Sequence, residues 1–265
     1  ICCRPFQTEL YRSAPPDTGI SAISDTTAAD TLDQIIAETP MPSAADELFD
    51  DFFFNFAANR KLQMKRIVFP LPVIVGKDTT FLPKKRWKMD HFFMHQDFYT
   101  LIFDNMKQMN VVKDTTINHV VVERINLPRR YVKGYVFNRI RGEWKMTSIV
   151  KTSLKASKNA SFLSFYHKFV RDTAFQVRSV NDPLEFTGPN PDDDFSSMSG
   201  ILAPEQWLSF APELPSGTIY NIIYGQRYTE SNQKIFVIRG IANGLETELT
   251  FRRKGGHWKL MKLLM

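Results

Sequence analysis

Residues 49–56 of the chain read Phe-Asp-Asp-Phe-Phe-Phe-Asn-Phe, and residues 162–169 read Phe-Leu-Ser-Phe-Tyr-His-Lys-Phe. In both segments the first, fourth, fifth and eighth positions are aromatic, and these positions fall on one face of an α-helix. An aromatic stripe at this spacing is typical of a helix face buried in a core rather than of a ligand site. We therefore predict a core helix at the start of each of two related units.

The similarity between these units continues downstream. Residues near both ends of each unit correspond at offsets of 113 or 114 positions. In the middle the offset rises, so that Trp87 corresponds to Trp207 and residues 99–103 correspond to residues 220–224 at an offset of 121. Offsets change where loops differ in length, which is where insertions are tolerated. Matches in the same order along the whole unit indicate a tandem duplication.

Each unit combines one helical segment with several strands. In the first unit we expect strands at residues 67–75 (bent by Pro70 and Pro72), 99–103, 117–125, 131–141 and 144–150. Short glycine-containing turns at residues 141–143 and 254–257 favour hairpins before the last strand of each unit. This order predicts an α+β fold with two domains, residues 46–155 and residues 156–265, and a boundary within residues 152–158.

Two short motifs, Gly142-Glu143-Trp144-Lys145-Met146 and Gly256-His257-Trp258-Lys259-Leu260, end the two units. With the leading aromatic helix and the middle tryptophan segment, they resemble the nuclear transport factor 2-like superfamily. The resemblance covers residues 46–265 and implies two tandem cone-shaped domains, each a helical segment and a curved antiparallel sheet in which the final tryptophan helps to close the cone. The superfamily includes isomerases, dehydratases and non-catalytic binding modules, so the resemblance implies no particular activity.

Residues 1–45 differ in composition from the rest of the chain. Ile1-Cys2-Cys3-Arg4 is similar to the end of a bacterial lipoprotein signal, with Cys3 as the lipid acceptor and Cys2 as the alternative; a remnant of an ordinary signal peptide is the other interpretation. The segment that follows is rich in Ala, Ser, Thr, Asp and Pro and reads as an acidic disordered tether, with Ser43 as a cap for the first helix. This pattern resembles bacterial envelope lipoproteins and predicts a periplasmic, outer-membrane or secreted location. It predicts membrane contact only through a lipid anchor.

The net charge of +6 is distributed unevenly. Residues 1–51 carry two basic and ten acidic residues, residues 52–157 carry 20 and seven, and residues 158–265 carry 12 and 11. The positive excess therefore belongs to the first unit, where residues 84–88 and the pair Arg129–Arg130 stand out. A basic run usually forms a solvated face, so we do not expect nucleic-acid binding.

Glu123, on an expected strand, is a candidate general base for an enzyme, with another carboxylate of the first unit as the alternative. An isomerase-type site needs a carboxylate facing hydrogen-bond donors, and Tyr99 and Tyr135 could supply hydroxyls. We interpret Glu123 instead as a solvent-facing strand residue. His91 and His95 have the i, i+4 spacing of some zinc sites but lack the accompanying glutamate, and residues 192–194 form an acidic loop without calcium-loop spacing. We therefore predict no metal and no cofactor.

The sequence as a whole favours a non-catalytic binding or interaction module of the cell envelope. The alternative is a small-molecule isomerase or dehydratase with a pocket in the first domain. The predicted ligand-binding residues lie at the mouths of the two cones: Trp87, Tyr99, Tyr135 and Arg139 in the first, and Trp207, Tyr220 and Arg253 in the second. The partner would be an unidentified small molecule or envelope protein. We expect a monomer whose two units pack as an intramolecular pseudo-dimer.

Overall fold

The computed structural model describes residues 46–190, 192–225, 231–241 and 243–265. The predictions made for Cys2, Cys3, Ser43 and the acidic tether therefore lie outside the described residues. Within the described residues, no helix is long and apolar enough to cross a membrane.

The aromatic stripe of the first unit forms helix α2 (Phe49–Ala58), as predicted, and Phe49, Phe52, Phe53 and Phe56 are all buried. A second helix that was not predicted, α3 (Arg60–Arg66), follows at once because the Asn59 side chain accepts a hydrogen bond from the Leu62 amide. The second unit repeats this pair as α5 (Ala160–Phe169) and α6 (Thr173–Ser179), where Asp172 caps α6. In each pair the first helix, α2 or α5, buries its aromatic face in a core, whereas the buried residues of α3 and α6 are polar.

The first six-stranded sheet has the order β2-β1-β6-β5-β4-β9. Its strands are β1 (Leu71–Val75), β2 (Asp78–Leu82), β4 (His119–Asn126), β5 (Tyr131–Ile140), β6 (Glu143–Ser153) and β9 (Thr218–Ile223). All neighbours are antiparallel except β1 and β6. The predicted turn between β5 and β6 is present, and Arg141 and Gly142 both have positive φ, as a tight hairpin turn with a right-handed twist requires.

The second six-stranded sheet has the order β3-β10-β11-β12-β7-β8. Its strands are β3 (Phe98–Phe103), β7 (Val180–Asn190), β8 (Asp193–Leu202), β10 (Gln233–Gly240), β11 (Glu246–Lys254) and β12 (His257–Leu264). Here β12 and β7 are the parallel neighbours. The short elements that connect the strands of both units are η2 (Lys84–Arg86), α4 (Met106–Met109), η3 (Asn110–Lys113), η4 (Leu154–Ala156), η5 (Pro204–Gln206) and α7 (Trp207–Phe210). The α+β class and the two curved sheets are thus confirmed.

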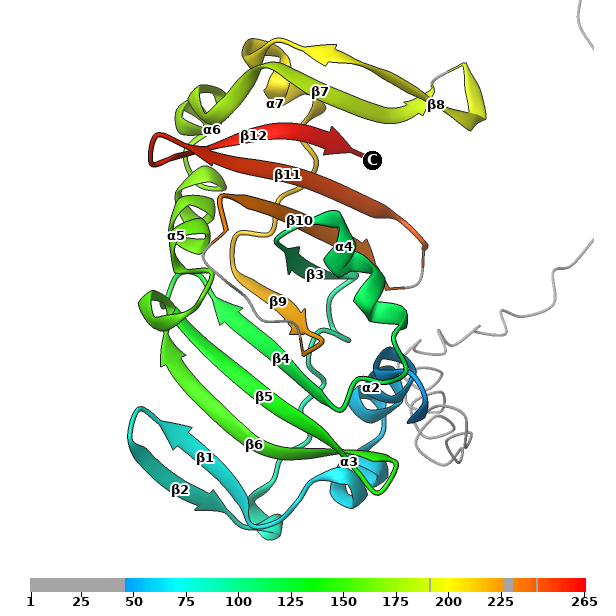
Figure 1. The fold of residues 1–265 in the computed structure, drawn as a ribbon, viewed down its shortest axis with the longest axis vertical. Helices are drawn as coiled ribbons and strands as arrows, with labels where there is room; N and C mark the ends of the chain where they lie inside the picture. The colour runs from blue at the N-terminus through cyan, green and yellow to red at the C-terminus, as the bar shows by residue number, and fades with distance from the viewer. Residues whose placement is uncertain (1–45, 191, 226–230, 242) are drawn as a thin grey trace, which may run out of the picture.

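The two units exchange one strand each. Strand β3 of the first unit pairs with β10 in the second sheet, and β9 of the second unit pairs with β4 in the first sheet (Figure 1). The two exchanged strands contact each other through buried polar groups. The Thr100 hydroxyl bonds to the Tyr220 backbone, and the Ile102 amide donates to the Asn221 side chain over 2.8 Å. The exchange therefore joins the two sheets at the centre of the molecule.

The sheet register corrects the sequence alignment of these two strands. Val121 pairs with Ile223 in the first sheet, and Ile235 pairs with Phe103 in the second. Val121 and Ile235 are equivalent residues of the two units, at an offset of 114. Their partners, Ile223 and Phe103, must therefore be equivalent too, which gives an offset of 120 and not 121 for these two strands. A shift of one residue moves every side chain to the opposite face of a strand. Tyr99 and Tyr220 are therefore not equivalent positions.

Each cone is closed by aromatic side chains. The Phe49 ring contacts the Trp144 ring at a centroid distance of 5.0 Å, and the Phe162 ring contacts the Trp258 ring at 5.5 Å. These are the positions where the resemblance implied a closing tryptophan. The first core gathers rings from α2 together with Tyr135, Phe137 and residues of both exchanged strands. The middle of the first cone is consequently filled by side chains.

Candidate functional site

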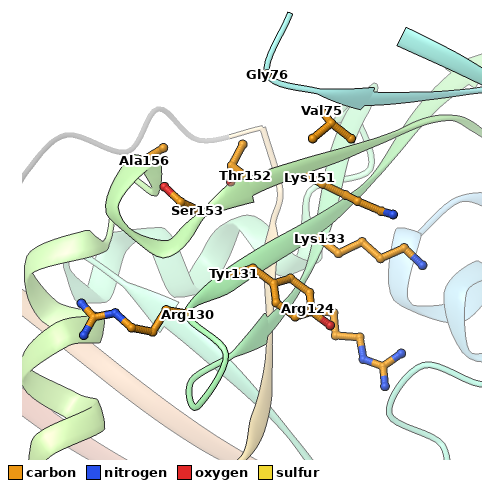
Figure 2. Close-up of a pocket in the computed structure, with 10 residues that line it drawn as sticks. All are labelled: Val75, Gly76, Arg124, Arg130, Tyr131, Lys133, Lys151, Thr152, Ser153 and Ala156. Carbon is orange, nitrogen blue, oxygen red and sulfur yellow. The ribbon is translucent and has the colours of Figure 1, made fainter. Parts of the chain in front are cut away.

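Three basic side chains form a row across the first sheet. Arg124 on β4 pairs in register with Lys133 on β5, and Lys133 pairs with Lys151 on β6. Residues that are directly opposite each other on neighbouring strands point to the same face, so the three cations lie side by side. Figure 2 shows their side chains extending to the same side, whereas Arg130 points away. We call Arg124, Lys133 and Lys151 the basic ladder.

The basic ladder lines an open groove of about 830 Å³. The groove also contains hydroxyl and apolar groups, and its full lining is Val75, Gly76, Arg124, Arg130, Tyr131, Lys133, Lys151, Thr152, Ser153 and Ala156. None of these ten residues is acidic. The ladder is on the same sheet face as Tyr135, beyond the aromatic core, and so lies at the mouth of the first cone.

The charges of the ladder are only partly balanced. Lys133 approaches Asp90 at 3.7 Å, and the Asp90 carboxylate also accepts a hydrogen bond from the Tyr135 hydroxyl. Among the described residues, neither Arg124 nor Lys151 forms a salt bridge. Burial lowers the pKa of Lys133, and the charges of Arg124 and Lys151 lower it further against the attraction of Asp90. The three cations therefore repel one another, and Asp90 is the one carboxylate that forms a salt bridge with any of them among the described residues.

The second unit does not repeat this row. At the offset of 114, Arg124, Lys133 and Lys151 correspond to Ile238, Thr247 and Met265. The equivalence is supported by the register, because Ile238 pairs with Thr247 as Arg124 pairs with Lys133. Even the β-bulge in the last hairpin occurs in both sheets, after Val136 and after Thr250. The same backbone thus forms without the three charges, so the fold does not require them.

The predicted mouth residues of the first unit have partners inside the protein. The buried Trp87 indole donates to Gln63 over 3.1 Å, and the Tyr99 ring stacks on Phe93. Arg139 lies over the Trp144 ring and donates to backbone carbonyls of Asp46, Glu47 and Thr115, which ties the start of the domain to β5. Tyr135 is buried beneath the ladder. Of these four, only Tyr135 is brought next to the groove residues.

The predicted residues of the second unit follow the same pattern. Trp207 is buried and donates to Gln176 over 3.0 Å, as Trp87 does to Gln63. Arg253 lies over the Trp258 ring and donates to Asn232 and Ser161. Tyr220 lies in the first sheet, not the second, because it belongs to the exchanged strand, and it pairs with Arg124. Tyr220 and Tyr135 therefore come together beside the ladder although they belong to different units.

Glu123 does not face Tyr99 or Tyr135. Tyr135 pairs with Val122 on the cone face of the sheet, whereas Glu123 pairs with Gly134 and points to the opposite face. Glu123 is half-buried rather than fully exposed to solvent: it lines a cavity, and burial raises the pKa of its carboxyl group. The His91 and His95 rings lie 4.4 Å apart. Among the described residues, no three His, Cys, Asp or Glu side chains gather as a metal site would require.

The basic ladder was missed because its residues are separated in the sequence. The contiguous basic run at residues 84–88 stands out in the sequence, whereas the ladder takes one residue from each of three strands. If the one-to-one pairing next to the hairpin turn at Arg141 and Gly142 continued along both strands, Lys133 would pair with residue 150. The bulge after Val136 shifts the true partner to Lys151. In the sequence the three cations are isolated residues on three strands, and the bulge hides the fact that Lys133 and Lys151 lie opposite each other.

Comparisons with known proteins agree with this architecture. The family model described as a domain of unknown function (DUF4348) matches residues 28–265. The crystal structure of an NTF2-like protein from Bacteroides fragilis NCTC 9343 is 41% identical to this chain, covers 85% of it and 98% of the other chain, and superposes with a TM-score of 0.77. No curated protein matches the chain. The chain therefore belongs to the DUF4348 family and has the nuclear transport factor 2-like fold.

Proposed function

We propose that the protein is a binding module whose first domain holds a small anionic molecule in the groove of the basic ladder. The fold alone is compatible with ligand binding or with catalysis. The observation that carries the proposal is the row of three cations in register, which the second unit of the same chain replaces with Ile238, Thr247 and Met265. Because the scaffold forms without these charges in the second unit, we infer that their role in the first unit is to bind a ligand.

The geometry of the ladder favours carboxylate or phosphate groups. Neighbouring strands lie about 4.8 Å apart, so the three cations are spaced to meet a ligand with two or three anionic groups. Arg124 can bind one such group through two parallel hydrogen bonds, and the lysines act as point charges. Tyr131 and Ser153 add hydroxyl groups at the edge of the groove. A bound anion would also relieve the repulsion between Lys133 and its neighbours.

The proposal is tested by calorimetric titration with citrate, glutarate and pyrophosphate as probes. We expect at least one of them to bind, and the double variant K133A/K151A to bind it at least tenfold more weakly, because a hydrogen bond to a charged group contributes roughly 1.5–3 kcal/mol. The matched control is K84A/K85A, which removes the same charge from the basic run outside the groove. Its affinity should stay within about twofold of the unaltered protein.

Two results would contradict the proposal. If both double variants weaken binding equally, the positive field of the whole domain is responsible and the groove is not a site. If none of the three anions binds at millimolar concentration in low salt, the groove does not select small anions.

We also propose a location in the bacterial cell envelope, with a lipid on Cys3. The support is the sequence Ile1-Cys2-Cys3-Arg4 and the acidic segment that follows it. A lipid on Cys3 would tether the domains to a membrane surface through residues 4–45. Intact-mass measurement of protein produced in a Gram-negative host gives the test, because unmodified thiols at both Cys2 and Cys3 would contradict it.

A further inference from the structure

A second cavity lies on the face of the first sheet opposite the basic ladder. It has a volume of about 350 Å³ and is lined by five aliphatic side chains, Val121, Val132, Val136, Val150 and Ile223. The only carboxylate among its lining residues is Glu123, and the segment from Ser157 to Asn159, just before α5, forms part of its wall. The cavity therefore combines an apolar surface with one carboxylate, one lysine (Lys158) and one histidine (His119).

The Glu123 carboxylate is held in place by the exchanged strands. The Ile102 amide donates to Oδ1 of Asn221, which fixes the orientation of that buried side chain. Its Nδ2 then donates to Oε2 of Glu123 over 2.9 Å. No described residue donates a hydrogen bond to the other oxygen, Oε1. One half of the carboxylate is thus satisfied and rigid, and the other half is available to a donor in the cavity.

A glycine keeps space open beside this carboxylate. Gly134 is directly opposite Glu123 on β5, and a Cβ atom there would lie 3.2 Å from Cγ1 of Val121. In the second unit, the positions of Glu123 and Gly134 are occupied by Val237 and Glu248, and Val237 is part of a core. The carboxylate and the space next to it are therefore features of the first unit and not of the common scaffold.

The lining of the cavity carries one acidic side chain, Glu123, and one basic side chain, Lys158. Burial raises the pKa of Glu123, and the hydrogen bond from Asn221 and the charge of Lys158 oppose this shift. His119, the other titratable residue of the lining, bonds to Asn138 through Nδ1. A second cation close to Oε1 would stabilise the ionised carboxylate more than a neutral group would.

We propose that this cavity binds a small aliphatic primary amine, with its ammonium group on Oε1 of Glu123 and its alkyl chain against the valine and isoleucine side chains. Glu123 and the basic ladder lie on opposite faces of the sheet, although Thr152 and Ala156 line both cavities.

The test compares n-butylammonium with 1-butanol, which has the same chain length but no charge. Titrations followed by NMR should show that the ammonium ion binds the unaltered protein at least tenfold more tightly than the alcohol. E123Q keeps the size of the side chain and removes its charge, and it should remove that preference while leaving the affinity for butanol unchanged. K158A removes a competing cation and should bind the amine as tightly as the unaltered protein or more tightly.

Three outcomes would overturn the proposal: equal binding of butanol and butylammonium, an undiminished preference in E123Q, or binding of neither probe. If E123Q fails to fold, the carboxylate carbon signal of Glu123 in the unaltered protein is the second readout. It must shift on addition of butylammonium and not on addition of butanol. The groove variant K133A/K151A should bind the amine normally, which separates a failure of this proposal from a failure of the anion site.

Discussion

Asp50 is a carboxyl group that two separate parts of the chain bury together. It lies in the first turn of α2 and accepts a hydrogen bond of 2.7 Å from the hydroxyl of Tyr224, which follows the exchanged strand β9. Burial raises the pKa of Asp50 to about 6, although the bond from Tyr224 and the charge of Arg239 oppose the increase. The ionised form of Asp50 is therefore disfavoured in the folded protein.

This raised pKa predicts how stability depends on pH. A group whose pKa is higher in the folded state stabilises that state below its unfolded pKa, near 4, and loses the contribution as pH rises through about 6. Relative to D50N, which can still accept the bond from Tyr224, the unaltered protein should lose up to about 3 kcal/mol between these limits. Urea unfolding of both proteins at several pH values measures the difference. A difference that does not change with pH would contradict the assignment.

The two middle tryptophans illustrate what residue-level sequence analysis could have inferred. Gln63 and Gln176 correspond in the two units, as Trp87 and Trp207 do. A buried indole needs an acceptor for its N–H group, and each glutamine supplies one. The joint repetition of tryptophan and glutamine therefore indicated a buried structural pair. A ligand-binding tryptophan at a cone mouth would not need that partner.

At the scale of the elements, a buried ion pair joins β3 to the sheet that receives it. Lys234 on β10 bonds to Asp104, which directly follows β3, and to Asn159 over 2.6 Å. Lys234 and Asp104 have only 2% and 6% of their side chains exposed. In the first unit, Val120 and Tyr224 occupy the corresponding positions, so an apolar residue can replace the lysine within the same fold.

Removal of one partner of this pair should be costly. We expect K234M to lower the free energy of unfolding by about 3–5 kcal/mol because Asp104 is left buried without a cation. The double variant K234M/D104L should recover most of that loss, because neither charge then remains. K145M is the control, since it removes a partly exposed pair with Glu143 and should cost about 1 kcal/mol or less. Additive losses in the double variant, measured by chemical denaturation, would contradict this account.

The sequence pattern predicted most elements but not which sheet receives β3 and β9. Residues 99–103 of β3 are buried on both faces, so no alternation shows which side of the strand faces which core. The duplication adds a further ambiguity, because β4 and β10 are related strands and present similar edges for pairing. Both the strand exchange and the offset of 120 follow from pairing between strands that are far apart in the sequence. Local periodicity carries no information about such pairing.

At the scale of the whole molecule, the exchange makes the two units dependent on each other. Without the second unit, β4 would have an unpaired edge and β3 would lose its partner β10; the second unit would lose β3 and leave β9 unpaired. Exposed edges and uncovered apolar strands favour association with other chains. We infer that the chain replaces such association by pairing its own two copies.

This mutual dependence of the two units predicts that the chain is monomeric in solution and unfolds as one cooperative unit. The full chain should have a monomeric mass by light scattering, a compact X-ray scattering profile, and a single unfolding transition by fluorescence and circular dichroism. Residues 46–155 and 156–265 produced separately should be unfolded or aggregated, and should recover the native circular dichroism spectrum only when mixed. A profile of two freely moving lobes, or two separate transitions, would mean that β3 and β9 return to their own units in solution. Since Asn221 belongs to β9, Glu123 would then lose the side chain that holds it, and the amine site would disappear with the exchange.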